Sequence, residues 1–166
     1  MTISINEAQL ESHSHFGLLE KNEDFKQCIL NLSRKKRILL VDDELDTCFS
    51  YQTVLEDAGF KCISYTDSIK ALQEFRPNYY DLILLDVRMP VLNGCELFEL
   101  FEKIREIDKT VQIIFITAFE GYYKEIGKQH YPELIDDINI NCLQKPVGNE
   151  ELIQVLNMVI ATKYTN

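Results

Sequence analysis

The chain has 166 residues, 46% of them hydrophobic and 27% charged, a composition typical of one globular domain with its own core. Its net charge of −10 argues against non-specific nucleic-acid binding, and no apolar run approaches the ~20 residues that cross a bilayer. The amino terminus lacks a secretory signal, so we expect a cytoplasmic protein with neither nucleic-acid nor membrane partners.

The five cysteines are odd in number and include no C-x-x-C pair. This argues against a disulfide framework or a zinc site. We expect free, buried thiols, the usual state of cysteine in a core.

The first 35 residues differ from the rest of the chain. They are polar with scattered apolar positions, and they predict a partly disordered extension with one helix at about 18–32. The pattern changes at residue 36, where short apolar runs begin to alternate with stretches of helical period. We therefore expect an extension over 1–35 and a domain over 36–166.

Five short runs, rich in β-branched and bulky residues, predict buried strands at 38–41, 62–65, 82–85, 111–116 and 138–143. The helical stretches between and after them are 44–58, 68–76, 94–107, 119–130 and 149–162. Gly59 suits a helix end. Strand–helix alternation repeated five times predicts an α/β fold, a doubly wound parallel sheet with helices on both faces.

Polar residues that could bind ligands or take part in a reaction follow the predicted strand ends. Asp42 and Asp43 follow the first strand, Asp86 the third and Thr117 the fourth, and Lys145 follows the fifth. Ligands of such sheets bind beyond these ends, where the strand order reverses. If the first and third strands are neighbours, three mutually repelling carboxylates converge there, and a Mg²⁺ ion would relieve the repulsion.

These residues together suit a phosphoryl group. The cation, Lys145 and Thr117 could each bind one of its oxygens, and Asp86 could be the nucleophile that receives it. Taken singly, each residue has an ordinary reading: Asp42–Asp43 as a helix N-cap, Asp86 as a turn residue, Thr117 as a strand terminus and Lys145–Pro146 as a loop. Their occurrence at successive strand ends favours the combined interpretation.

Four motifs carry a family resemblance. VDDE at 41–44, LLDVRMPVLNG at 84–94, FITA at 115–118 and LQKP at 143–146 resemble the receiver domain of two-component response regulators, over about residues 36–163. The resemblance implies a flavodoxin-like sheet of order 2-1-3-4-5, like that of the chemotaxis regulators.

The resemblance also implies residue roles. Asp86 would accept a phosphoryl group from a sensor histidine kinase or a histidine phosphotransfer protein, as in a phosphorelay. Mg²⁺, with Mn²⁺ as an alternative, would be held by Asp86, by Asp43 directly, by Asp42 through water and by the backbone carbonyl of Arg88. Thr117 and Lys145 would bind phosphoryl oxygens, and the Lys145–Pro146 peptide bond would be cis. Such a protein is a signalling switch that catalyses only its own phosphorylation and dephosphorylation.

Three features depart from the family pattern. Cys142 stands where an aromatic residue is usual, so output coupling would need a neighbour such as Tyr122 or Tyr123. The interval from Thr117 to Lys145 is longer than expected, with the extra residues in QHYPELIDD. Arg88 and Phe119 occupy rim positions that tune the access of water, which predicts a longer-lived phosphoryl group.

The function has two alternatives. A receiver-shaped docking module that no longer uses phosphate is favoured by Cys142. A metal-dependent phosphatase would need D-x-D-x-T, whereas the sequence is DDELD without a fitting threonine.

Since few residues follow the last helix, we expect a stand-alone receiver without an output domain. Its output would be contact with an unidentified downstream protein, and a homodimer stays open.

Overall fold

The computed structural model describes residues 34–86, 97–118 and 142–162. Contacts between residues divide the chain into two units, Met1–Lys35 and Lys36–Asn166. The helices predicted at 18–32 and 119–130 lie outside the described residues. The fold described below belongs to the second unit.

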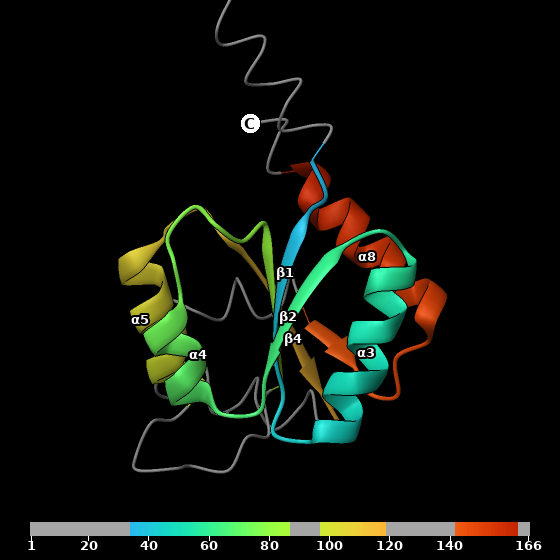
Figure 1. The fold of residues 1–166 in the computed structure, drawn as a ribbon, viewed down its shortest axis with the longest axis horizontal. Helices are drawn as coiled ribbons and strands as arrows, with labels where there is room; N and C mark the ends of the chain where they lie inside the picture. Colours follow the sequence, from blue (N-terminus) through green and yellow to red (C-terminus); the bar gives the residue numbers. More distant parts are fainter. Residues whose placement is uncertain (1–33, 87–96, 119–141, 163–166) are drawn as a thin grey trace, which may run out of the picture. The chain divides into compact units, whose positions relative to one another are not determined.

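Five parallel strands form one sheet in the order β2-β1-β3-β4-β5 (Figure 1). Their bounds are β1 Arg37–Val41, β2 Lys61–Tyr65, β3 Leu82–Asp86, β4 Gln112–Thr117 and β5 Cys142–Gln144. The first four confirm the predicted strands to within one residue at each end. The described fifth strand covers only the end of the predicted range and continues one residue beyond it. The doubly wound order 2-1-3-4-5 is confirmed.

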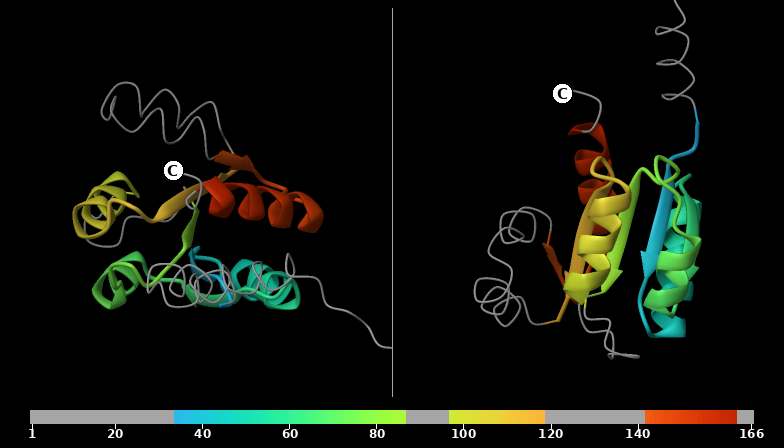
Figure 2. Two further views of the ribbon diagram at one scale, coloured as in Figure 1. Left: turned by 90° about the horizontal axis from the view of Figure 1, so that it is seen from above. Right: turned by 90° about the vertical axis from the view of Figure 1, so that its left-hand side faces the viewer.

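Within the described residues, two pairs of helices cover the two faces of the sheet (Figures 1 and 2). Helices α4 (Ser68–Glu74) and α5 (Leu97–Ile107) lie on one face, and α3 (Leu45–Asp57) and α8 (Asn149–Thr162) lie on the other. In the parts of the chain that the structure describes, no helix combines the length and apolarity that a membrane span requires.

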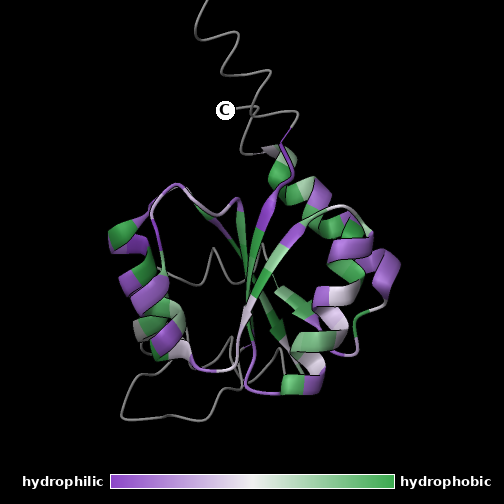
Figure 3. Ribbon diagram, in the orientation of Figure 1, coloured by the Kyte–Doolittle hydropathy of each residue, from purple (hydrophilic) through white to green (hydrophobic). Residues whose placement is uncertain are grey.

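Alternate residues of each strand build two separate cores. Leu39 and Ile83 pack toward α4 and α5, whereas their chain neighbours Leu40 and Leu84 pack toward α3 and α8. In the hydropathy colouring, green therefore dominates the middle of the sheet, with purple where β1 and β2 begin, and the helices show both purple and green (Figure 3). Burial on both faces is why the sequence has continuous apolar runs rather than alternating ones.

Local signals explain several helix boundaries. Asp67 caps α4 by accepting hydrogen bonds from the backbone N–H groups of Ile69 and Lys70. Helix α3 is followed by Gly59 with φ of 90°, a left-handed conformation that favours glycine. Ile107, the last residue of α5, is 44% exposed.

A buried carboxylate ties together two loops at the edge where the strands begin. Asp108 is 5% exposed and accepts hydrogen bonds from the backbone N–H groups of Asn78, Thr110 and Val111 and from the Thr110 hydroxyl. Burial alone would raise the pKa of Asp108, but these hydrogen bonds outweigh it and hold the pKa below its ordinary value. Asp108 thus joins the loop before β3 to the loop before β4.

Candidate functional site

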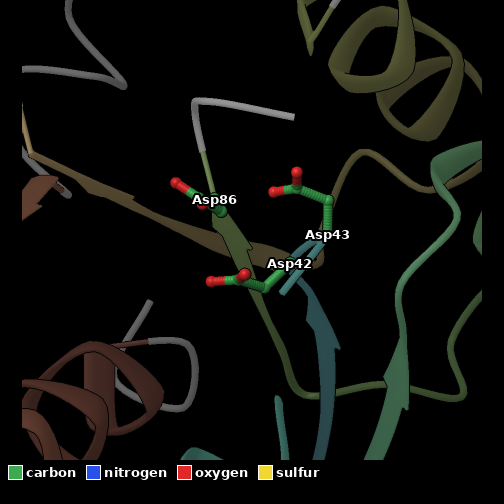
Figure 4. A group of neighbouring side chains, drawn as sticks. All are labelled: Asp42, Asp43 and Asp86. Carbon is green, nitrogen blue, oxygen red and sulfur yellow. The ribbon is translucent and has the colours of Figure 1, made fainter. Parts of the chain in front are cut away.

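Three carboxylates lie together where β1 and β3 end (Figure 4). In the register of the two strands Val41 is opposite Leu85, so Asp42 and Asp86 emerge side by side, and Asp43 follows directly. One carboxylate oxygen from each of the three residues lies within 4.8 Å of the others. Asp42 and Asp86 are 1% and 3% exposed, whereas Asp43 reaches solvent. The predicted convergence of the three acids is confirmed.

Lys145 bridges two of these acids. Its Nζ lies 2.8 Å from Asp42 Oδ2 and 2.9 Å from Asp86 Oδ2. The lysine follows β5, so its side chain reaches back toward the ends of β1 and β3. One ammonium among three carboxylates leaves two negative charges in excess, which is the charge that one divalent cation would neutralise.

Thr117 is the last residue of β4 and is fully buried. Its carbonyl accepts a hydrogen bond from the Lys145 backbone N–H at 2.7 Å, which joins the ends of β4 and β5. The Lys145–Pro146 peptide bond is cis, as the resemblance implied. Lys145 is therefore held against the end of β4 by its backbone and against Asp42 and Asp86 by its side chain.

Burial and hydrogen bonding have opposite effects on the pKa values of Asp42 and Lys145. Burial raises the pKa of the Asp42 carboxyl, with a further contribution from Asp86, and outweighs the hydrogen bonds from Lys145 and Glu44. Burial would lower the pKa of Lys145, but its hydrogen bonds to Asp42 and Asp86 outweigh that effect and raise it. Lys145 is thus held as an ammonium, while the negative charge of Asp42 is only partly compensated.

The backbone around Asp42 is fixed by contacts that the sequence did not reveal. The Glu44 N–H donates to Asp42 Oδ1 at 2.9 Å, and the Asp42 N–H donates to the Tyr65 carbonyl at 3.2 Å. The Cys48 thiol donates to the Asp42 carbonyl at 3.2 Å. The N-cap of α3 is Glu44, so reading Asp42–Asp43 as the N-cap is wrong.

The remaining sequence predictions divide into two groups. Arg88, Phe119, Tyr122 and Tyr123 lie outside the described residues. Cys142 pairs in register with Phe115 and packs, partly buried, against the core beside α4 and α5. Of the described cysteines, Cys48 and Cys62 are free and buried as predicted, and Cys142 is partly exposed.

The acidic cluster has the donor chemistry of a site for a hard cation. Carboxylate oxygens are the ligands that Mg²⁺ prefers, and it is usually held by one or two carboxylates together with water. Asp43 is the most accessible of the three acids, while both Asp42 oxygens already accept hydrogen bonds, from Glu44 and Lys145. The arrangement fits a cation held by Asp43 and Asp86, with Asp42 contributing less directly.

Comparison with known proteins identifies the family. Residues 38–157 match the response regulator receiver domain. The chain belongs to this family. The five-stranded sheet and the acidic cluster at its edge are thus those of a receiver domain.

Two curated relatives illustrate the similarity. The receiver domain is 33% identical over 124 residues to the "Transcriptional regulatory protein CpxR homolog" of Haemophilus influenzae, covering 75% of this chain and 50% of that protein. It is 32% identical over 128 residues to the "Probable transcriptional regulator ycf29" of Porphyra purpurea, covering 74% of this chain and 56% of that protein. The chain thus spans about half the length of these relatives.

A solved structure supports the same assignment. The "Non-phosphorylated HemR Receiver Domain" from Leptospira biflexa is 28% identical, with a TM-score of 0.63, over 76% of this chain and 95% of that one. The similarity therefore extends over nearly the whole of that receiver domain.

Proposed function

We propose that this receiver domain is a phosphorylatable signalling switch in which Asp86 accepts a phosphoryl group from a phosphohistidine. The observation that carries the proposal is the contact of Asp86 with Lys145 beside two further carboxylates within 4.8 Å. A structural ion pair would need one acid for one base. The surplus of acids instead suits a site that takes up a cation and then a phosphoryl group.

Asp86 has the position of a nucleophile. It ends a strand that is buried along its whole length, so its carboxylate is held rigidly at the sheet edge. In the proposed step a carboxylate oxygen of Asp86 attacks the phosphorus of an N-phosphohistidine. The P–O bond forms as the P–N bond breaks, and the imidazole leaves with the electron pair of that bond.

Lys145 and Thr117 would bind the transferred group. The Lys145 ammonium already contacts the Asp86 carboxylate, so it lies within reach of oxygens added there. The Thr117 hydroxyl would donate to another oxygen from the end of β4. Asp42, Asp43 and the Arg88 carbonyl are the residues we propose to hold Mg²⁺ or Mn²⁺ with Asp86. The cation would neutralise charge on the phosphoryl oxygens.

An apolar surface beside the acids suits a partner protein. Leu45 and Phe49, one turn apart on α3, are 72% and 74% exposed. Large exposed side chains at helical spacing next to a site are typical of a docking surface for another protein. We infer that the kinase or phosphotransfer protein contacts these residues when it presents its phosphohistidine to Asp86.

We propose that residues 1–35 are an extension to the receiver domain at 36–166. We also propose that phosphorylation changes a face that binds a downstream protein. The names of both curated relatives describe transcriptional regulators, and each is about twice as long as the matched region.

Beryllofluoride, a mimic of the phosphoryl group, tests the proposal by NMR titration in the presence of Mg²⁺. We expect new amide signals at the ends of β1, β3 and β4 in the wild type and none with Asp86→Asn. Asp46→Asn, an exposed acid in the first turn of α3, is the matched control and should respond like the wild type. A phosphate-independent docking module would bind no beryllofluoride, and that result would overturn the proposal.

A further inference from the structure

Cys48, on α3, contacts the backbone of the acidic cluster formed by Asp42, Asp43 and Asp86. It lies on the face of α3 that packs on the sheet and is 2% exposed. Its backbone N–H makes the ordinary helical bond to the Glu44 carbonyl at 2.9 Å. Its thiol points out of the helix to the Asp42 carbonyl at 3.2 Å and lies 3.8 Å from the Tyr65 carbonyl. One side chain thus joins the ends of β1 and β2 to α3.

These contacts hold the Asp42 backbone on both sides. The Asp42 N–H donates to the Tyr65 carbonyl, and the Asp42 carbonyl accepts from the Cys48 thiol. The Asp42 carbonyl and the Asp43 N–H belong to one planar peptide group. Fixing the carbonyl therefore fixes the orientation of the peptide plane that precedes the Cα of Asp43. In the described parts of the chain, no hydrogen bond holds the Asp43 carboxylate itself. Its direction therefore depends on its backbone.

We propose that Cys48 is a positioning residue for the cation site, and that its thiol orients the Asp42–Asp43 peptide so that the Asp43 carboxylate faces Asp86. The proposal rests on the proposed function, in which Asp43 holds the cation. A thiol is a weak donor, but a free thiol has an ordinary pKa of ~8.5 and keeps its proton at pH 7. In a buried site a weak hydrogen bond can select one peptide orientation without competing for the cation.

The test measures Mg²⁺ affinity by NMR titration of the full chain. Cys48→Ala and Cys48→Val both remove the donor, and valine, which is slightly larger than cysteine, leaves no cavity. We expect the Mg²⁺ Kd to rise about tenfold in both, the low end of the loss seen when an outer-shell partner of a metal ligand is removed. Cys48→Ser keeps a donor and should retain an affinity close to that of the wild type.

Cys62→Ala is the matched control for packing. Cys62 is a second buried thiol in the same core, 6% exposed, on β2. Its loss should lower the melting temperature and leave the Mg²⁺ Kd unchanged. Phosphorylation by acetyl phosphate provides a second readout: Cys48→Ala should be slow at low Mg²⁺ and approach the wild-type rate at saturating Mg²⁺.

The outcomes separate this proposal from the one on which it rests. Unchanged Mg²⁺ affinity in Cys48→Ala and Cys48→Val overturns the role of Cys48. An equal loss in Cys62→Ala, or a loss in Cys48→Ser as large as in Cys48→Ala, also overturns it, because packing would then explain the effect. If the wild type binds no Mg²⁺, or if Asp43→Asn binds it as well as the wild type, the proposed function itself fails.

Discussion

Lys145 Nζ lies 2.9 Å from Asp86 Oδ2, although 59 positions separate the two residues in the chain. The contact depends on the order of the sheet, which places β4 between β3 and β5 and directs all three carboxyl ends to one edge. Asp42, which follows β1, accepts a hydrogen bond from the same ammonium. The charge balance of the site is therefore a property of the whole sheet rather than of one loop.

Removing the ammonium should separate cation binding from phosphoryl transfer. We predict that Lys145→Met binds Mg²⁺ more tightly than the wild type, because three carboxylates then lack their competing cation. The same variant should be phosphorylated by acetyl phosphate about a hundredfold more slowly, the scale of losing one charge-stabilising donor. Calorimetric Mg²⁺ titration and a phosphorylation time course provide the two measurements.

Lys61→Met is the control for this experiment, since Lys61 is an exposed lysine at the start of β2, away from the acids. It should leave both quantities unchanged. Weaker Mg²⁺ binding in Lys145→Met would contradict the idea that the ammonium and the cation compete for the same carboxylates.

The raised pKa of Asp42 predicts a stability change with pH in the absence of metal. A carboxyl whose pKa is higher in the folded state contributes stability below its unfolded value of ~3.9, and that contribution is lost as pH rises through the folded pKa. In EDTA, the melting temperature of the wild type should therefore fall relative to that of Asp42→Asn as pH increases from about 4 to neutrality. Thermal melts across this range measure the difference.

Magnesium should reverse this loss for the wild type. A ligand at a hundred times its Kd stabilises the folded state by about 2.7 kcal/mol, and Asp43→Asn should lose that gain. A difference between wild type and Asp42→Asn that does not change with pH would show that the buried Asp42 charge does not govern metal-free stability.

Asp108 should stabilise the domain far from the site. Asn at this position keeps one acceptor oxygen but presents an amide donor to the Asn78 N–H, so Asp108→Asn should lose about 1–3 kcal/mol at pH 7. Because the pKa of Asp108 is lowered, its contribution is present above ~3.9 and lost as pH falls. Urea unfolding at several pH values should show the variant converging on the wild type in acid.

Asp57→Asn, an exposed acid at the end of α3, is the matched control and should change the unfolding free energy little. A loss of the same size for Asp57→Asn, or no loss for Asp108→Asn, would remove the structural role given to Asp108.

The lifetime of the phosphoryl group is a prediction from the sequence alone. The resemblance to receiver domains implies rim positions for the bulky Phe119 and the cationic Arg88, and both lie outside the described residues. We expect Phe119→Ala to lose its phosphoryl group several times faster than the wild type. A dephosphorylation time course after removal of the phosphodonor compares the two, and equal rates would exclude shielding by Phe119.

The sequence predicted the sheet well because strands buried on both faces leave a strong signal. The runs ending at Val41 and Leu85 are continuously apolar, and the chemistry at their ends stands out against them. Parallel strands bring their carboxyl ends to one edge, so the meeting of Asp42, Asp43 and Asp86 followed from topology.

Contacts that depend on side-chain geometry were not predictable in this way. Nothing in the sequence indicates that one ammonium serves both Asp42 and Asp86, or that the Cys48 thiol reaches back beyond its own helix. A charged residue such as Asp108 is normally assigned to the surface. Its burial depends on three backbone N–H groups that two separate loops present to it.

The most direct test of the central claim is the intact mass of the protein after incubation with acetyl phosphate and Mg²⁺. The account predicts one added phosphoryl group in the wild type, none in Asp86→Ala, and none when EDTA replaces Mg²⁺. Asp46→Asn should be phosphorylated like the wild type. An unmodified wild type, or an Asp86→Ala variant that still gains the group, would contradict the account.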